Sequence, residues 1–285
     1  MAYHYLNQAA IDLFIKQALA EDIGPGDYST LASVPAGATK QARLLLKSEG
    51  ILAGVELARQ IFAHFDPDLK FTELMPDGSA YKQGQEAFNV EGSGQTILSC
   101  ERLVLNCMQR MCAIATKTHQ MSLQLVGTKA KLLDTRKTTP NFRLPEKWAV
   151  KIGGGTNHRF ALYDMVMLKD NHIDYAGGIK SALALTKAYL ETNQLDLEIE
   201  IEIRTKAELE EALEMGIAQR ILLDNMMPSL VAECVQMVAG RAITEASGGI
   251  AENTLRDYAL TGVDFISAGA LTHSAGSLDM SLKAM

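Results

Sequence analysis

Lysine and arginine are concentrated in one segment of this acidic chain, residues 131–173. The segment has eight lysines or arginines against four acidic residues, whereas the whole chain has a net charge of -7. Such a local excess is typical of a site for a small anion, since a nucleic-acid surface would need a wider basic stripe. The segment also has three consecutive glycines and two histidines. We therefore expect an active site there, spread over two loops.

A second pattern of possible chemical importance is the alternation of glutamate and isoleucine in LEIEIEI, residues 197–203. Alternation places Glu198, Glu200 and Glu202 on one face of a strand. On an edge strand these side chains would face water, which is the default for Glu198, but in a barrel the same face points inward. Glu202, together with Asp224 from the next strand, could then bind Mg²⁺ or sugar hydroxyls. The sequence leaves both readings open.

Glycine-rich stretches follow the last two apolar runs, SGGI at 247–250 and SAGALTHS at 267–274. Glycines at such places let backbone N–H groups approach a phosphate, although glycine is also frequent in ordinary turns. Because two such loops are expected on adjacent strands, the phosphate interpretation is favoured.

Four single residues allow more than one role. Lys169 ends an apolar run, where desolvation could make it a Schiff-base lysine, but simple anion binding is equally open. His158 and His172 lack an obvious third ligand, so we expect no zinc site. Arg102 lies among apolar residues and needs an anionic partner, either a substrate or another subunit.

The elements that must position these residues follow one another in a regular order. Apolar runs occur at residues 130–134, 164–168, 197–203, 221–224, 242–246 and 263–267. Polar loops and helical segments separate them, which predicts βαβ units with a parallel sheet. The polar residues of interest follow the C-terminal ends of these strands, where α/β barrels place their active sites. We therefore predict an α/β barrel.

The first part of the chain predicts a smaller α+β unit. The expected elements are a helix capped by Asn7, a strand at 41–47, and helices at 56–65 and 99–125. We expect an N-terminal α+β domain over residues 1–112, joined by the tail 274–285, and a catalytic barrel over residues 113–273.

Composition excludes several classes of protein. No apolar run is long enough for a membrane span, and the N-terminus lacks the pattern of a signal peptide. The pI of about 5.4 argues against nucleic acid and anionic membranes as partners. The four cysteines show no CxxC spacing, and three fall on one apolar helix, so we expect buried thiols and a cytoplasmic location.

Six motifs in fixed order resemble those of quinolinate phosphoribosyltransferase, the decarboxylating enzyme of NAD biosynthesis. They are DTRKTTP, GGGTNHR, LYDMVMLKDNHI, LLDNM, EASGGI and GALTHS. ALAEDIGPGDYST and EGILAG near the N-terminus also match, so the resemblance covers nearly the whole chain. It implies an open parallel α/β barrel of the type II phosphoribosyltransferase kind with an N-terminal α+β sandwich domain. Asn141 stands where the family often has glycine.

The resemblance implies a basic pocket for the two carboxylates of quinolinate and for phosphates. Its residues would be Arg136, Lys137, His158, Arg159 and Lys169. Arg102 would come from a neighbouring subunit, which implies a homodimer or a larger assembly of dimers.

The resemblance also implies the site of the second substrate, phosphoribosyl pyrophosphate. Glu202 and Asp224 would hold its ribose hydroxyls and Mg²⁺, and Ser247, Gly248 and Gly269 would cradle its 5′-phosphate. The catalytic residues would be Lys137, Lys169, Glu202 and Asp224.

Three alternatives remain open. A paralogous pyrophosphorylase-like protein would use the same pocket for another acceptor. A Schiff-base aldolase-type barrel would use Lys169, and borohydride would trap it with a carbonyl substrate. A non-catalytic anion-binding protein would have no use for so many polar residues at the strand ends.

Overall fold

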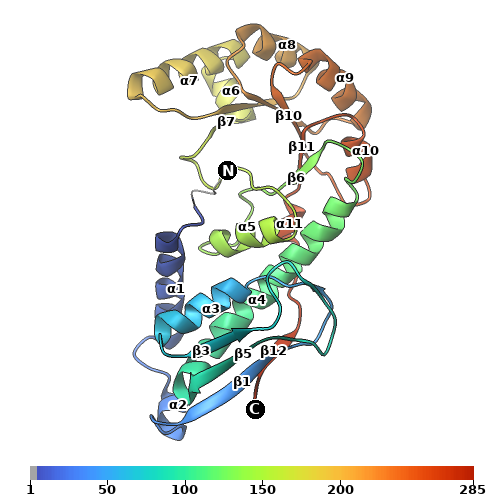
Figure 1. Ribbon diagram of the computed structural model, residues 1–285. Coiled ribbons are helices and arrows are strands. Elements are labelled where there is room, and N and C mark those ends of the chain that lie inside the picture. Colours follow the sequence, from blue (N-terminus) through green and yellow to red (C-terminus); the bar gives the residue numbers. More distant parts are fainter. Residues whose placement is uncertain (1–4) are drawn as a thin grey trace. The chain divides into compact units, whose positions relative to one another are not determined.

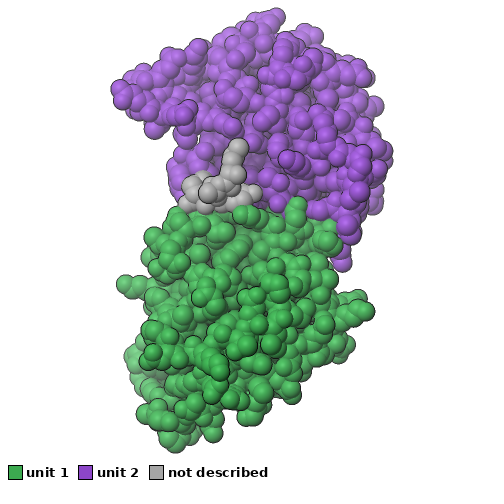
Figure 2. All heavy atoms as spheres, in the orientation of Figure 1, with its two compact units in different colours: residues 1–119, 138–154, 271–285 green, residues 120–137, 155–270 purple. Residues whose placement is uncertain are grey.

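The computed structural model describes residues 5–285, which form two compact units (Figures 1 and 2). Unit 1 comprises residues 1–119, 138–154 and 271–285, and unit 2 comprises residues 120–137 and 155–270. Each unit is therefore built from segments that are discontinuous in the sequence.

Unit 1 combines helices with small antiparallel sheets. Its helices are α1 (Gln8–Ile23), α2 (Tyr28–Ser33), α3 (Val55–Phe65), α5 (Arg143–Ile152) and most of α4 (Gly94–Leu123). Its strands are β1 (Thr39–Leu46), β2 (Gly50–Ile51), β3 (Lys70–Glu73), β4 (Ala80–Tyr81), β5 (Glu86–Ser93) and β12 (Met280–Ala284). The side chain of Asn7 accepts the backbone N–H of Ala10 over 3.0 Å, so the predicted cap of α1 is confirmed.

The main sheet of unit 1 has the strand order β12-β1-β5-β3. Its C-terminal strand β12 pairs with β1, with Leu282 opposite Leu44. The rings of Phe62 on α3, Phe71 on β3 and Phe88 on β5 contact one another, with centroids 4.5 to 6.4 Å apart. These contacts fix α3 against the inner face of the sheet (Figure 1).

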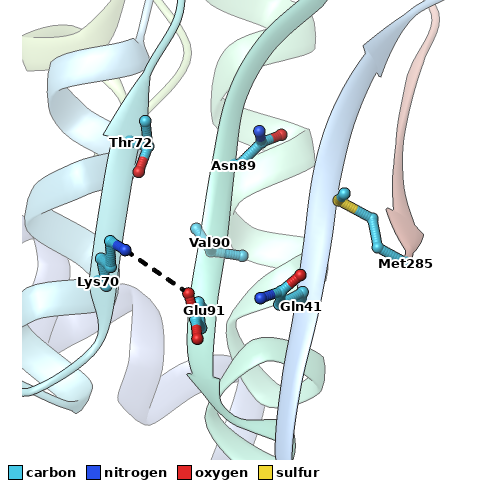
Figure 3. A pocket seen from close by; sticks show the side chains of 7 residues that line it. All are labelled: Gln41, Lys70, Thr72, Asn89, Val90, Glu91 and Met285. Carbon is cyan, nitrogen blue, oxygen red and sulfur yellow. Dashed lines mark ion pairs between the residues drawn. The ribbon is translucent and has the colours of Figure 1, made fainter.

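Polar side chains line a shallow pocket on the strands of this sheet (Figure 3). Lys70 of β3 and Glu91 of β5 form an ion pair across it, with Nζ 3.7 Å from Oε2. Gln41 and Met285 border the pocket on the β1 side. Both partners of the ion pair are exposed, so this pair contributes little to stability.

Unit 2 alternates strands with helices, as predicted. Its strands are β6 (Lys131–Leu133), β7 (Val166–Leu168), β8 (Ile199–Ile203), β9 (Arg220–Asp224), β10 (Ile243–Ser247) and β11 (Phe265–Ser267). Its helices are α6 (Asp170–Ala176), α7 (Ile179–Asn193), α8 (Lys206–Met215), α9 (Pro228–Val238) and α10 (Leu255–Ala259), and α11 (Ala270–His273) begins at its last residue.

The six strands of unit 2 form a parallel sheet with the order β6-β11-β10-β9-β8-β7. The edge strands β6 and β7 do not pair with each other; instead Thr156 bridges to Leu133 beside β6. The helices α6 to α9 follow the outer side of the curved sheet in Figure 1. This is the open parallel α/β barrel that was predicted.

The segment 131–173 differs from its prediction in one respect, because it contains the helix α5 as well as loops. Gly153 caps this helix, and a β-carbon there would lie 2.4 Å from the carbonyl oxygen of Ala115 on α4. Close packing of α5 against α4 therefore explains the first of the three glycines. Asn141, just before α5, has φ +60°, a left-handed conformation that asparagine tolerates in place of glycine.

The thiols behave as predicted, since all four cysteines are buried and none is in a disulfide. In the described part of the chain, no helix has both the length and the hydropathy that crossing a membrane requires.

Candidate active site

The parallel sheet of unit 2 brings most of the predicted site residues to one edge, where the carboxyl ends of its strands meet. The residues in or just after these strand ends are Arg136, Lys137, Lys169, Glu202, Asp224, Ser247, Gly248 and Gly269. Of the other predicted residues, His158 and Arg159 lie on the loop before β7, and Arg102 is exposed on α4 in unit 1.

Two arginines of this group, Arg136 and Arg159, influence each other electrostatically. Both are partly buried, and the guanidinium group of Arg159 donates to the carbonyl oxygen of Met165 over 3.1 Å. Burial lowers the pKa of Arg159, and the positive charge of Arg136 lowers it further. Because an anion close to both would offset this repulsion, the pair favours binding of a carboxylate or phosphate.

The two predicted lysines are exposed. Lys137 donates its backbone N–H to Thr135 Oγ1 over 3.0 Å, which orders the loop after β6. Lys169 Nζ lies 3.9 Å from Glu202 Oε2, and the Lys169 side chain is 50% exposed. A half-exposed ammonium group keeps much of its hydration, so the desolvation that the Schiff-base alternative requires is missing.

Glu202 and Asp224 lie on the neighbouring strands β8 and β9. Burial raises the pKa of Glu202, and the negative charge of Asp224 raises it further. Lys169 opposes this shift, as does a hydrogen bond from the backbone N–H of Asp170. Two carboxylates that repel each other form a site that a divalent cation stabilises, and their oxygens are the ligands that Mg²⁺ prefers.

The turn after β10 is packed tightly against the residue after β9. Gly248 has φ +96°, and a β-carbon there would lie 2.4 Å from Asn225 Oδ1, so no larger residue fits. Asn225 has φ +54° and donates its backbone N–H to the carbonyl oxygen of Ser247 over 2.9 Å. Gly269 follows the adjacent strand β11, so both glycine-containing turns lie at the same edge.

His158 is nearly buried, with its side chain 6% exposed. Its Nε2 lies 2.9 Å from Glu200 Oε2 and 3.5 Å from Glu245 Oε2, and both carboxylates are buried on inward positions of β8 and β10. Burial alone would lower the pKa of His158, but hydrogen bonds to the two glutamates outweigh it and raise the pKa to about 9. The sequence predicted an anion-binding histidine, whereas this nitrogen faces carboxylates of the protein.

Asp134 holds the loop that carries His158. This carboxylate is fully buried and accepts hydrogen bonds from Asn157 Nδ2 over 2.7 Å and from the backbone N–H of His158 over 2.8 Å.

The sequence assigned no role to Glu245, which lies between Thr244 and Ala246 in an otherwise uncharged strand. A carboxylate at an inward position of a barrel strand was the signal that could have identified it.

Comparison with known families matches both parts of the chain. Residues 27–112 match the N-terminal domain of quinolinate phosphoribosyl transferase, and residues 114–283 match its C-terminal domain. The chain belongs to the quinolinate phosphoribosyltransferase family. Every site residue in unit 2 falls within the second match, and Arg102 falls within the first.

Curated members of the family resemble this chain over most of its length. The decarboxylating quinolinate phosphoribosyltransferase 1b of Nicotiana tabacum is 45% identical over 94% of this chain and 81% of its own length. A probable carboxylating nicotinate-nucleotide pyrophosphorylase of Bacillus subtilis is 39% identical over 97% of this chain and 94% of its own.

The fold agrees with a solved structure of a family member. The crystal structure of NadC from Streptococcus pyogenes has a TM-score of 0.90 to this chain at 38% identity, with 98% of this chain and 97% of that chain covered. Both the barrel and the N-terminal domain are therefore those of quinolinate phosphoribosyltransferases.

Proposed function

We propose that this chain transfers the phosphoribosyl group of phosphoribosyl pyrophosphate to quinolinate with decarboxylation. The products are nicotinate mononucleotide, pyrophosphate and CO₂. The observation that supports this proposal is that one barrel contains both a repelling carboxylate pair, Glu202 and Asp224, and a repelling arginine pair, Arg136 and Arg159.

The carboxylate pair suits the chemistry at the anomeric carbon of the ribose. The pyridine nitrogen forms a bond to this carbon while the bond to pyrophosphate breaks, so positive charge grows on the sugar and negative charge on the leaving group. Glu202 and Asp224 stabilise the sugar and its hydroxyls, whereas Lys137 and Lys169 stabilise the leaving group. No serine or cysteine nucleophile is needed.

Mg²⁺ fits the same pair of carboxylates. The charge of Asp224 contributes to the raised pKa of Glu202, so a cation bound by both groups would relieve the electrostatic repulsion between the two carboxylates. When bound, Mg²⁺ would supply charge neutralisation for the pyrophosphate of the substrate.

The basic group suits quinolinate, which has two adjacent carboxylates. In this proposal Arg136, Lys137, Arg159 and Lys169 bind these groups, and His158 contributes through the loop that it shares with Arg159. After the bond from nitrogen to ribose forms, the ring nitrogen is positive. The bond from C2 to its carboxylate then breaks with loss of CO₂, and the electron pair left on C2, which the adjacent positive nitrogen stabilises, takes up a proton.

Ser247, Gly248 and Gly269 are proposed to bind the 5′-phosphate through backbone N–H groups. The tight turn at Gly248 supports this assignment, because glycine is required there for close approach of the backbone.

We further propose that the protein is a homodimer, or an assembly of dimers, in the cytoplasm. Arg102 is exposed on α4, so its side chain is accessible to a substrate that is bound in a neighbouring subunit. The buried free thiols are compatible with a reducing compartment.

The direct test incubates the purified protein with quinolinate, phosphoribosyl pyrophosphate and Mg²⁺ and measures nicotinate mononucleotide by chromatography. Lys137→Ala and Arg159→Ala should abolish product, whereas Lys131→Ala, an exposed lysine at the opposite end of β6, should not. Nicotinate in place of quinolinate should give no product. A folded protein that is inactive with quinolinate would refute the proposal and favour a paralogue acting on another acceptor.

A further inference from the structure

Three ionisable side chains meet in the interior of the barrel, where no substrate group has been assigned. His158 Nε2 lies 2.9 Å from Glu200 Oε2 and 3.5 Å from Glu245 Oε2. The two glutamates are 0% and 1% exposed, and the strand β9 separates their strands. We refer to these three residues as the interior cluster.

The two buried carboxylates of the interior cluster are unfavourable for the free energy of folding, and this requires an explanation. Burial of a carboxylate is unfavourable unless a partner compensates it, and here two carboxylates are close enough that the charge of Glu245 helps to raise the pKa of Glu200. Negative charge inside a barrel that binds anionic substrates also opposes their binding. The imidazole of His158 is the compensating group, since its Nε2 lies within 4 Å of a carboxylate oxygen of each glutamate.

The other side of the same imidazole leads to the proposed anion site. His158 Nδ1 accepts a hydrogen bond from the backbone N–H of Arg159 over 2.7 Å. The backbone N–H of His158 donates to Asp134 Oδ1 over 2.8 Å. The ring is therefore fixed at both nitrogens, by carboxylates at one and by the backbone of Arg159 at the other.

We propose that Glu245, acting together with Glu200, is a positioning residue for quinolinate binding. The two carboxylates hold the imidazole of His158 inside the barrel, and this fixes the loop from which the next residue, Arg159, extends its guanidinium group. This inference deepens the proposed function and rests on it. Its chemical consequence is selective, because the dicarboxylic acid depends on Arg159 and phosphoribosyl pyrophosphate depends on other residues.

A metal ion is the competing occupant of the interior cluster. One ligand atom from each of the three residues lies within 4.8 Å of the others, which a divalent cation could bridge. The ligand count favours a proton over a metal ion, since the described residues supply three ligands where a tetrahedral site takes four.

The test compares Glu245→Gln and Glu245→Leu with Glu198→Gln, a matched control at the exposed residue just before β8. Removal of the acceptor in Glu245→Leu should raise KM for quinolinate by roughly tenfold, with KM for phosphoribosyl pyrophosphate nearly unchanged. Glu245→Gln keeps an acceptor oxygen and should restore part of this loss. The control should match the wild type for both substrates.

Nitrogen NMR of histidine-labelled protein reads the interior cluster without turnover, with the His158 signal assigned from a His158→Gln variant. We expect a protonated Nε2 in the wild type and a changed His158 signal in Glu245→Gln. The Glu245→Gln variant keeps the test possible if Glu245→Leu does not fold. If the wild type proves inactive with quinolinate, this signal still reports whether the cluster exists.

Three results would overturn the inference. The first is an unchanged His158 signal and unchanged KM values in both Glu245 variants. The second is an equal rise of both KM values that follows a loss of thermal stability, which would indicate a merely structural role. The third is one equivalent of a divalent metal in the purified wild type that Glu245→Gln loses, which would make the cluster a metal site.

Discussion

The backbone N–H of Asn225 donates to the carbonyl oxygen of Ser247 over 2.9 Å, and this bond connects two parts of the proposed phosphoribosyl pyrophosphate site. Asn225 follows Asp224 at the end of β9, and Ser247 ends β10. The position of the carboxylate pair is therefore coupled to that of the phosphate-binding turn. Changes at this connection should affect one substrate more than the other.

Gly248→Ala places a β-carbon 2.4 Å from Asn225 Oδ1 at a backbone φ of +96°. The turn must shift to accept it, so we expect a loss of about 1–3 kcal/mol in the free energy of unfolding and a marked rise in KM for phosphoribosyl pyrophosphate. Chemical denaturation and steady-state kinetics measure the two effects. Gly240→Ala is the control, because Gly240 also has positive φ, +75°, but nothing lies within 4 Å of its added β-carbon. Equal kinetics for the two variants would contradict the prediction.

Asn225 offers a second change at the same connection. Its Nδ2 donates to Asp224 Oδ2 over 2.5 Å, and Asn225→Gly removes this bond while it permits the φ of +54°. We expect roughly a tenfold loss in kcat/KM for phosphoribosyl pyrophosphate. Asn225→Asp should be worse, since it adds a negative charge beside Asp224. An Asn225→Asp variant as active as Asn225→Gly would show that the charge of this position is unimportant.

The sequence predicted the barrel and the strand-end residues because both depend on local patterns. Apolar runs of strand length predicted the bounds of β6 to β11 to within two residues, and the polar residue after each run then fell at the carboxyl edge. Glu202 and Asp224 could be paired in advance, since strands that are consecutive in the chain are neighbours in such a barrel.

Contacts between segments distant in the chain could not be predicted in this way. His158 and Glu245 are separated by 87 positions, and no periodicity indicates that a loop residue will enter the barrel to meet a carboxylate of β10. The helix α5 was missed because its basic residues were taken as part of the anion site. Its packing against α4, which requires Gly153, becomes visible only in three dimensions.

The raised pKa of Glu202 predicts the acidic limb of the pH profile. Because burial and Asp224 raise this pKa, Glu202 stays protonated up to a higher pH than an ordinary glutamate. If catalysis needs the ionised form, kcat/KM should fall on the acidic side at correspondingly higher pH. More Mg²⁺ should move this limb to lower pH, since a bound cation favours ionisation. The measurement is kcat/KM against pH at low and high Mg²⁺ concentration. An acidic limb at the same pH in both conditions would argue against metal binding at Glu202.

Arg110 and Glu146 should contribute to stability rather than to catalysis. Glu146 is fully buried in unit 1, accepts Arg110 Nε over 3.0 Å and Thr139 Oγ1 over 2.9 Å, and Arg110 also donates to the carbonyl oxygen of Thr272 over 2.5 Å. Arg110→Met leaves a buried carboxylate without its charged partner, so we expect a loss of about 3 kcal/mol in the free energy of unfolding. Arg43→Ala, which breaks an exposed pair with Glu86, should cost less than about 1 kcal/mol. Similar losses in chemical denaturation would contradict this distinction.

Subunit mixing tests whether Arg102 serves the active site of a neighbour. Arg102 is exposed on α4, so Arg102→Ala should fold normally and yet lose activity if the side chain binds substrate in another subunit. Lys169→Ala should also be inactive, because Lys169 belongs to the barrel site. When the two variants are unfolded together and refolded as mixed dimers, one site of each mixed dimer has both residues intact. Because random reassortment makes half of all dimers mixed, roughly a quarter of wild-type activity should return. Activity that stays absent in verified mixed dimers would mean that Arg102 and Lys169 act within one chain or that Arg102 has no part in binding.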